Sequence, residues 1–184
     1  MRGGRRAFFG SGRGMSDHAR CFPPIASPDS RVLILGSMPG RASLAAGQYY
    51  AHPRNAFWPI MGRLLGFAAS QDYPARVDAL QVAGIAVWDV LDSCHRPGSL
   101  DSAIDDGSLV ANDLAGFLVT HAAIGHVFFN GAKAESCFRR HVTLTLPERR
   151  IAFTRLPSTS PAHAGLSFER KLDAWRAVTR ALAG

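Results

Sequence analysis

Four short apolar runs constrain the fold of this chain most strongly. They lie at residues 32–35, 85–88, 127–129 and 151–153. Each run is continuously apolar rather than alternating, as in strands that are covered on both faces of a sheet. Segments with helical spacing separate the runs, and alternation of strand and helix favours a parallel sheet. The sequence therefore predicts an α/β fold with about four parallel strands and helices on both faces.

Helices are predicted where apolar residues recur at intervals of three and four. Gly66 is the expected end of the first helix, and Ser108 and Ser167 are the expected caps of the third and the last. Long loops are expected after the first two strands, at residues 36–55 and 89–106. The predicted helices are 57–65, 73–82, 109–121, 132–140 and 168–182.

Length and composition indicate one domain. The chain has 184 residues, of which 47% are hydrophobic, and this is enough for a full core without disulfides. Residues 1–28 contain the glycine- and proline-rich coil and are expected to form a flexible basic extension, whereas residues 29–184 form the single domain. Met15 is an alternative start to Met1, because residues 1–14 read as coil.

The net charge of +7 leaves two interpretations open. Only two of the 21 basic residues are lysines, and arginine suits bidentate contacts with phosphate, which favours a polyanionic partner. Several arginines lie within the first twenty residues, however, and these would equally form a solvated basic tail.

The cysteine count argues against a metal site built from cysteine alone. Cys21, Cys94 and Cys137 are far apart, and the chain has no Cys-x-x-Cys pair. An odd and sparse count favours a reducing cytoplasm. No apolar run reaches the length that spans a membrane.

Polar side chains follow each predicted strand, and in a parallel sheet these loops meet at one edge, where α/β proteins place their sites. Each motif also has a purely structural interpretation. Residues 36–40 form a turn or a phosphate loop, Asn55 caps a helix or positions water or a base, and Asp89 caps its loop or accepts a ligand N–H. Residues 158–161 form a capped turn or a phosphate contact, and His163 is incidental or functional.

Taken together, these motifs resemble those of the uracil-DNA glycosylase superfamily, and most closely its hypoxanthine-DNA (deoxyinosine) glycosylase branch, sometimes called family six. The resemblance covers residues 29–182, and its first block, GSMPG at residues 36–40, is highly specific. The supporting blocks follow in the expected order: SL at 43–44, YYAHPRNAFW at 49–58, GIAVWDV at 84–90, RPGS at 96–99 with Asp101 and Ile104, NG at 130–131 and STSPA at 158–162.

The resemblance implies a three-layer α/β/α sandwich around a central four-stranded parallel sheet. It also implies base excision, in which a damaged base is flipped out of DNA and its N-glycosidic bond is hydrolysed, because the glycosidic carbon is inaccessible inside the stack. No metal or redox cofactor is implied, since the iron–sulfur branches of the superfamily need four cysteines and this chain has three.

The resemblance also implies roles for individual residues. Most relatives carry an activating Asp or Asn where this chain has Met38. The hypoxanthine branch shares that gap and relies on the Asn of its His-Pro-Arg-Asn segment, so Asn55 is the expected catalytic residue, orienting water through its side-chain oxygen. Tyr50 takes the place of an aromatic that stacks on the flipped base, a contact worth about 1–3 kcal/mol. Asp89 takes the place of the residue that reads the base edge, and it could accept the ring N–H of hypoxanthine.

The second motif of the superfamily usually contains a histidine that helps the leaving group. Depending on register, Ser158 or Leu156 stands at that position, so the general acid is not identified. Ala162 and His163 are candidates for the wedge that fills the vacated stack. The expected base-binding residues are Gly36, Ser37, Met38, Tyr50, Asp89 and Asn130, and the expected DNA-binding residues are His52, Arg54, Arg96, Lys133, Ser158, Thr159, Ser160, Ala162 and His163.

We therefore expect a cytoplasmic, monomeric DNA glycosylase that removes hypoxanthine from DNA without a cofactor or metal. A monofunctional enzyme is favoured because the two lysines, Lys133 and Lys171, lie outside the two main motifs, and a lyase needs a pocket amine. One alternative is a uracil or mismatched-thymine glycosylase. Another, of a different class, is a catalytically inactive protein of the same fold that binds DNA or a nucleotide, which Met38 and the missing histidine would favour.

Overall fold

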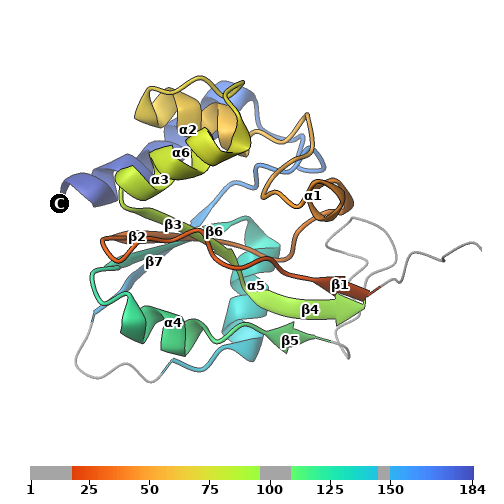
Figure 1. Ribbon diagram of the computed structural model, residues 1–184, viewed down its shortest axis with the longest axis vertical. Helices are drawn as coiled ribbons and strands as arrows, with labels where there is room; N and C mark the ends of the chain where they lie inside the picture. Colours follow the sequence, from red (N-terminus) through yellow and green to blue (C-terminus); the bar gives the residue numbers. More distant parts are fainter. Residues whose placement is uncertain (1–17, 96–108, 145–149) are drawn as a thin grey trace, which may run out of the picture.

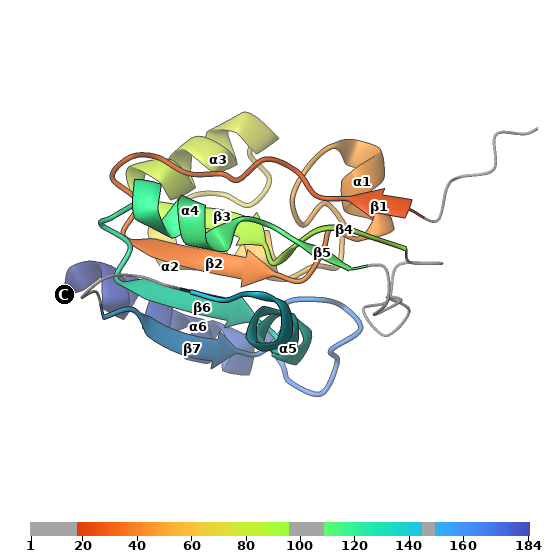
Figure 2. The same cartoon turned by 90° about the horizontal axis from the view of Figure 1, so that it is seen from below.

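A four-stranded parallel sheet forms the centre of the molecule in the computed structural model, which describes residues 18–95, 109–144 and 150–184. The strand order is β3-β2-β6-β7, and all three pairings are parallel. Figure 2 shows β2, β6 and β7 running in the same direction. The predicted parallel sheet is confirmed. The strands are β2 Val32–Gly36, β3 Ile85–Asp89, β6 His126–Asn130 and β7 Ala152–Leu156.

Helices cover both faces of this sheet and complete the three-layer sandwich (Figure 1). On one face, α2, α3 and α6 pack over Ile34 and Phe128 of the sheet. On the other face, α4 and α5 pack over Leu33 and Phe129. The helices are α2 Phe57–Leu65, α3 Tyr73–Val82, α4 Leu114–Thr120, α5 Ala132–His141 and α6 Phe168–Ala183.

Capping residues fix where two of these helices begin. The Ser167 side chain accepts a hydrogen bond from the backbone N–H of Arg170, so the predicted cap of α6 is confirmed. The start predicted for α4 at residue 109 is wrong, because Asp113 caps the helix by accepting from the backbone N–H of Gly116 at 2.9 Å. Ser108, the cap expected for this helix, lies outside the described residues.

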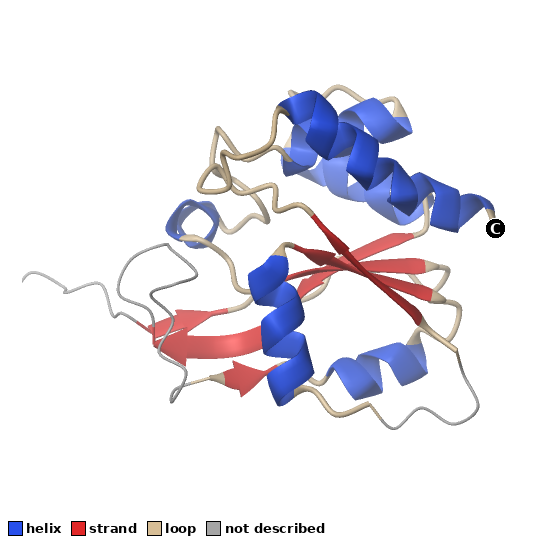
Figure 3. Cartoon of the chain, turned by 180° about the vertical axis from the view of Figure 1, so that it is seen from behind, coloured by secondary structure: helices blue, strands red, loops and turns tan. Residues whose placement is uncertain are grey.

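A second, antiparallel sheet of three short strands lies beside the first (Figure 3). Its strands are β1 His18–Arg20, β4 Leu91–His95 and β5 Val110–Ala111. The sequence analysis missed this sheet, because β4 carries Asp92 and Ser93 and its composition is typical of a loop. The six-residue helix α1 Arg41–Ala46 was also read as part of a loop.

From residue 18 onward the N-terminal segment pairs with strands of both sheets, β1 with β4 and Ile25 with Val87 of β3, within the range 1–28 that the sequence analysis assigned to a flexible extension. Ile25 is buried and exchanges two backbone hydrogen bonds with Val87, at 2.9 and 2.8 Å. The indole N–H of Trp88 donates to the carbonyl of Phe22 at 3.1 Å. Residues 1–17 of the predicted basic extension lie outside the described residues.

Strand β7 is an edge strand and departs from the expectation that all four strands are covered on both faces. Phe153 is 43% exposed, and Ala152 and Arg155 are exposed as well. The reason is topological, because β7 pairs with β6 on one side and forms the end of the sheet on the other.

None of the helices within the described ranges is both long and apolar enough to cross a membrane.

Candidate active site

A cavity of about 610 Å³ lies at the carboxyl edge of the central sheet. This volume is in the usual range for small-molecule sites, about 300–1,000 Å³. The loops after β2 and β7 contribute, and β3 and β6 each contribute their last residue, Asp89 and Asn130, as expected for parallel strands that end at one edge. The lining residues are Gly36, Ser37, Met38, Pro39, Gly40, Arg41, Ala42, Ser43, Tyr49, Tyr50, His52, Arg54, Asn55, Asp89, Asn130, Ser158, Thr159, Ser160, Pro161, Ala162 and His163.

Asp89 lies beside Gly36 at the ends of two paired strands. The two residues are register partners of β2 and β3, and Asp89 is buried. A Cβ atom on Gly36 would overlap Oδ1 of Asp89 and would lie 3.2 Å from the hydroxyl of Tyr50. Glycine is therefore required at position 36 to make room for the carboxylate within the cavity.

The N-terminal segment lies behind this carboxylate. Sγ of Cys21 is 3.6 Å from Oδ2 of Asp89 and 3.7 Å from the hydroxyl of Tyr49. Burial, followed by the charge of Asp89, raises the pKa of the Cys21 thiol to about 12. The same two causes raise the pKa of Tyr49. Asp89 thus stands against two neutral, protonated side chains.

The raised pKa predicts slow alkylation of Cys21. Only the thiolate reacts with iodoacetamide, so at pH 8 the rate should be about 10³-fold below that of an ordinary cysteine with a pKa near 8.5. Because protonation is what protects the thiol, the rate should rise about tenfold per pH unit as the pH increases towards 12. Peptide mapping by mass spectrometry after timed labelling measures this. Labelling of Cys21 at the rate of an ordinary thiol would contradict it.

Tyr50 has a constrained backbone at the cavity wall. Its φ is 55°, a left-handed conformation that costs a non-glycine residue about 1–2 kcal/mol. Side chains hold the backbone on both sides of it: the indole N–H of Trp58 donates to the Tyr49 carbonyl at 2.9 Å, and the Ala51 N–H donates to Oγ of Ser43 at 3.2 Å. The neighbouring chain therefore imposes the Tyr50 conformation.

The Tyr50 ring is stacked on Phe57, with ring centroids 4.0 Å apart and planes inclined by 22°. Phe57 is fully buried and belongs to the first turn of α2. One face of Tyr50 is therefore covered, and a base in the cavity would meet the opposite face or the ring edge.

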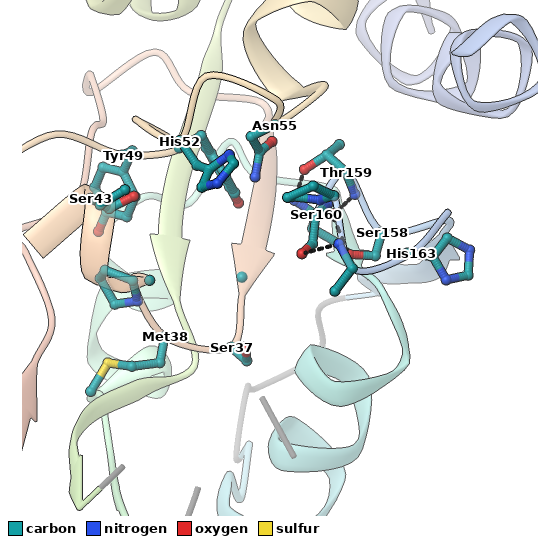
Figure 4. Close-up of a pocket in the computed structure, with 18 of the residues that line it drawn as sticks. Ser37, Met38, Ser43, Tyr49, His52, Asn55, Ser158, Thr159, Ser160 and His163 are labelled. Atoms are coloured by element: carbon teal, nitrogen blue, oxygen red, sulfur yellow. Dashed lines mark hydrogen bonds between the residues drawn. The ribbon is translucent and has the colours of Figure 1, made fainter. Parts of the chain in front are cut away.

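Asn55 lies just before α2, where it caps the helix start and also lines the cavity. Its Oδ1 accepts a hydrogen bond from the backbone N–H of Phe57 at 2.9 Å, which caps the helix start. The side chain also lines the cavity, across from the segment that carries Thr159 and Ser160 (Figure 4). A carbonyl oxygen has two lone pairs, so the capping bond fixes the orientation of the amide and leaves Oδ1 a second acceptor site.

His52 and Arg54 lie on the same turn at the cavity. Nδ1 of His52 accepts from the backbone N–H of Arg54 at 3.1 Å, which places the proton of the neutral imidazole on Nε2. The Asn55 N–H donates to the His52 carbonyl at 2.8 Å, so this turn is held in a fixed shape. Arg54 is exposed, as is Arg41 at the start of α1, and both bring positive charge to the cavity.

Met38 borders the cavity, but most of its side chain is packed in the core. Its side chain is 6% exposed and belongs to the hydrophobic core with Leu35, Val90 and Leu114. Figure 4 shows it turned away from Asn55 and His52. An apolar thioether is favoured in that core. Residue 38 therefore borders the cavity, while its side chain packs in the hydrophobic core.

Asn130 and Thr159 both line the cavity, and their polar groups bond to each other. Nδ2 of Asn130 donates to Oγ1 of Thr159 at 2.9 Å, and Oδ1 of Asn130 accepts from the Thr159 N–H at 2.9 Å. Thr159 is 1% exposed, so its hydroxyl is not on a surface that a DNA phosphate could reach. The Thr159 carbonyl accepts from the N–H of Ala56, next to Asn55, at 3.0 Å. The pair thus connects the end of β6 to the turn that carries Asn55.

The rest of the loop after β7 presents its tip at the cavity rim. The Ser160 N–H donates to Oγ of Ser158 at 3.2 Å, and the Ala162 N–H donates to Oγ of Ser160 at 3.3 Å. These bonds are the capped turn that the sequence suggested. Ala162 and His163 are exposed, which places both wedge candidates where a DNA strand could meet them.

Two buried side chains of α6 hold this loop from behind. Nζ of Lys171 donates to the His163 carbonyl at 2.7 Å, and the indole N–H of Trp175 donates to the Pro157 carbonyl at 3.0 Å. Burial lowers the pKa of Lys171. Lys171 is 6% exposed, and its amine stabilises the loop through the bond to the His163 carbonyl.

Lys171→Met should separate activity from stability. Methionine keeps an apolar stem but lacks the donor to His163, so the loop is less restrained, and a hydrogen bond of about 1 kcal/mol is lost. We expect DNA binding and activity to fall about three- to tenfold, while the melting temperature stays within about 3 °C, because burial of an amine is also avoided. Arg170→Met, at the exposed neighbouring position, is the matched control. Equal binding by the two variants would contradict this role.

Two expected DNA contacts are not placed in the cavity. Arg96 lies outside the described residues. Lys133 is the second residue of α5 and is not part of the cavity lining. Sequence reasoning in turn missed Cys21 and Ser43 as parts of the site. Their contacts depend on tertiary packing, and only Ser43 lay within a recognised motif block.

Comparisons with known proteins agree with this geometry. Residues 23–182 match the model of the family described as the Uracil DNA glycosylase superfamily. The chain is 33% identical over 163 residues to a protein of Methanosarcina acetivorans named Hypoxanthine DNA glycosylase, covering 88% of this chain and 98% of that protein. A protein of Methanosarcina barkeri with the same name is 35% identical over 114 residues, covering 61% of this chain and 71% of that protein.

A solved structure is similar to this one over almost its whole length. It is the solution NMR structure of a putative uracil DNA glycosylase from Methanosarcina acetivorans. The TM-score is 0.73 at 31% sequence identity, and the match covers 91% of this chain and 99% of that chain. The described residues themselves contain no group of three His, Cys, Asp or Glu side chains arranged to hold a metal ion.

Proposed function

Since the chain belongs to the uracil DNA glycosylase superfamily, we propose that it is a monofunctional DNA glycosylase that hydrolyses the N-glycosidic bond of hypoxanthine flipped out of DNA. The observation that carries the proposal is the Asp89 carboxylate, which lies over Gly36 at the carboxyl edge of the sheet. The names of the two Methanosarcina relatives support the same substrate. The product is an abasic site in DNA.

The charge of Asp89 favours hypoxanthine over uracil. Each base presents a ring N–H that a carboxylate can accept. In uracil two carbonyl oxygens flank that N–H, whereas in hypoxanthine one side carries a carbonyl and the other a C–H. A carboxylate that accepts the uracil N–H is therefore repelled by a carbonyl oxygen on each side. A carboxylate that accepts the hypoxanthine N–H is repelled by a carbonyl oxygen on one side only. The side chain that reads the base thus selects the purine by charge.

Asn55 and the positively charged rim supply the remaining parts of the reaction. The helix-capping bond from Phe57 holds the Asn55 amide in place, and its second acceptor site orients a water molecule towards the glycosidic carbon. The reaction passes through an oxocarbenium-like sugar, so catalysis comes mainly from positioning of water and base. The DNA phosphates stabilise the cationic sugar, while Arg41 and Arg54 hold the strand at the rim. Tyr50 packs against the extruded base.

The enzyme acts by hydrolysis rather than by forming a covalent imine. Such an imine needs an uncharged amine beside the sugar. Lys171 is turned towards the His163 carbonyl on the far side of the loop, and the cavity lining found among the described residues contains no lysine. The released product should therefore be an intact abasic strand that alkali, and not the enzyme, cleaves.

A panel of duplex oligonucleotides tests this function. Each duplex carries one deoxyinosine, one uracil or one G·T pair in the same sequence, and alkali reveals abasic sites after incubation. We expect release of hypoxanthine, confirmed by chromatography of the free base. Faster release of uracil would assign the chain to the alternative within the superfamily. Binding of every duplex without release of any base would show an inactive DNA-binding protein.

A further inference from the structure

We propose that Cys21 is a positioning residue for Asp89, and that its thiol turns the carboxylate so that one oxygen faces the flipped purine. This inference deepens the proposed function and rests on it. It assigns a role to the N-terminal segment, which lies outside the motifs that mark the site in the sequence.

The two carboxylate oxygens of Asp89 have different surroundings. Oδ2 is 3.6 Å from Sγ of Cys21, within the reach of a hydrogen bond from sulfur. Oδ1 lies over Gly36 at the cavity. With Oδ2 bound from behind, Oδ1 is the oxygen presented to a ring N–H. The backbone that carries this side chain is fixed as well, because Nδ2 of Asn112 donates to the main-chain carbonyl of Asp89 at 2.9 Å.

Competition for one carbonyl directs the thiol proton to Asp89. Sγ of Cys21 has a second acceptor within reach, the Phe22 carbonyl at 3.2 Å. That oxygen also accepts from the indole N–H of Trp88 at 3.1 Å and lies 3.3 Å from the Tyr49 hydroxyl. A carbonyl oxygen has two lone pairs. The indole takes one of them, and the Tyr49 hydroxyl competes for the other while it also has the Pro23 carbonyl within reach at 3.3 Å. Oδ2 of Asp89 carries negative charge and is therefore the stronger acceptor for the thiol proton.

The backbone fixes the thiol where it acts. The Cys21 N–H donates to the Asp92 carbonyl of β4 at 2.6 Å, and Ile25 bonds to Val87 of β3 four residues later. The segment is thereby hydrogen-bonded to both β3, which ends at Asp89, and β4, which follows it. Burial and the nearby carboxylate keep the thiol protonated, so it remains a donor throughout the working pH range.

Substitutions that remove the donor test the role. Cys21→Ala and Cys21→Val both lack it, and valine fills the space of the thiol, so a folding defect of one variant leaves the other informative. For each we expect kcat/KM on hypoxanthine DNA to fall about five- to tenfold and the hypoxanthine-to-uracil ratio of kcat/KM to fall with it. Cys21→Ser keeps a donor and should recover most of the ratio. Cys137→Ala, which removes another buried thiol outside the cavity lining, is the matched control.

Binding to a duplex that already contains an abasic site separates positioning from general damage. That duplex has no base to contact Asp89, so its affinity should stay within about twofold in every Cys21 variant. In an Asp89→Asn background, Cys21→Ala should change the ratio no further, because the two residues act as a unit.

Two results would overturn the inference. One is an unchanged hypoxanthine-to-uracil ratio in both donor-less variants. The other is an equal loss of base release and of abasic-site affinity, which would show that Cys21 only supports the structure. Absence of hypoxanthine release by the wild-type protein is a separate outcome, since it would refute the proposed function itself.

Discussion

Asn55→Ala should release hypoxanthine at least about 100-fold more slowly than the wild type in single-turnover assays. The reason is that the amide holds the attacking water, and loss of correct positioning typically costs two orders of magnitude or more. Binding to the same DNA should remain within about threefold, because Asn55 contributes to the cavity lining rather than to the rim. Quenched time courses at enzyme excess and a binding titration measure the two quantities.

Stability needs a control in this experiment, because Asn55 also caps α2. Loss of such a cap costs about 1 kcal/mol, so Asn55→Ala should melt a few degrees lower. Asn55→Asp keeps an oxygen that can accept from the Phe57 N–H and a second lone pair for water. We expect this variant to retain the wild-type melting temperature and more activity than the alanine variant. An Asn55→Ala protein that is folded and fully active would remove Asn55 from the mechanism.

Asp89→Asn should lower the hypoxanthine-to-uracil ratio of kcat/KM at least about tenfold. Asparagine keeps an acceptor for the ring N–H but replaces the negative charge with an N–H₂ donor that a flanking carbonyl can accept. Uracil, with carbonyls on both sides of its N–H, gains the most from this change. Hydrogen bonds to charged groups are worth about 1.5–3 kcal/mol, which corresponds to a tenfold effect or more.

Asp92→Asn provides the matched control, because Asp92 lies on β4 and its carboxylate is 3.8 Å from Arg20 at the surface. Its substitution should leave the ratio unchanged, since exposed ion pairs contribute little. If Asp89→Asn released both bases with the wild-type ratio, the charge at position 89 would not set specificity, and another residue of the cavity would have to do so.

The central sheet was predictable because buried parallel strands leave a strong signal. Continuous apolar runs such as residues 32–35 can fold in few other ways, and the spacing of α3 gave its bounds without error. The second sheet was not predictable on the same grounds. Its strand β4 has polar residues and is stabilised by pairing with β1, which lies far earlier in the sequence, and with the two-residue strand β5.

The site was predictable where position along the chain implies position in space. Gly36, Asp89 and Asn130 end parallel strands, so their meeting at one edge follows from topology. The hydrogen-bond partners of their polar groups could not be predicted from this topology. Asn130 and Thr159 are 29 residues apart and satisfy each other, and Cys21 reaches Asp89 across 68 residues. Such pairings depend on tertiary contacts that no local pattern contains.

The most direct test is the pair of wild-type single-turnover rates on two duplexes that differ only in carrying deoxyinosine or deoxyuridine at one position. The Asp89 geometry predicts that hypoxanthine is released at least about tenfold faster than uracil. Faster release of uracil, or no release of hypoxanthine at all, would contradict the account.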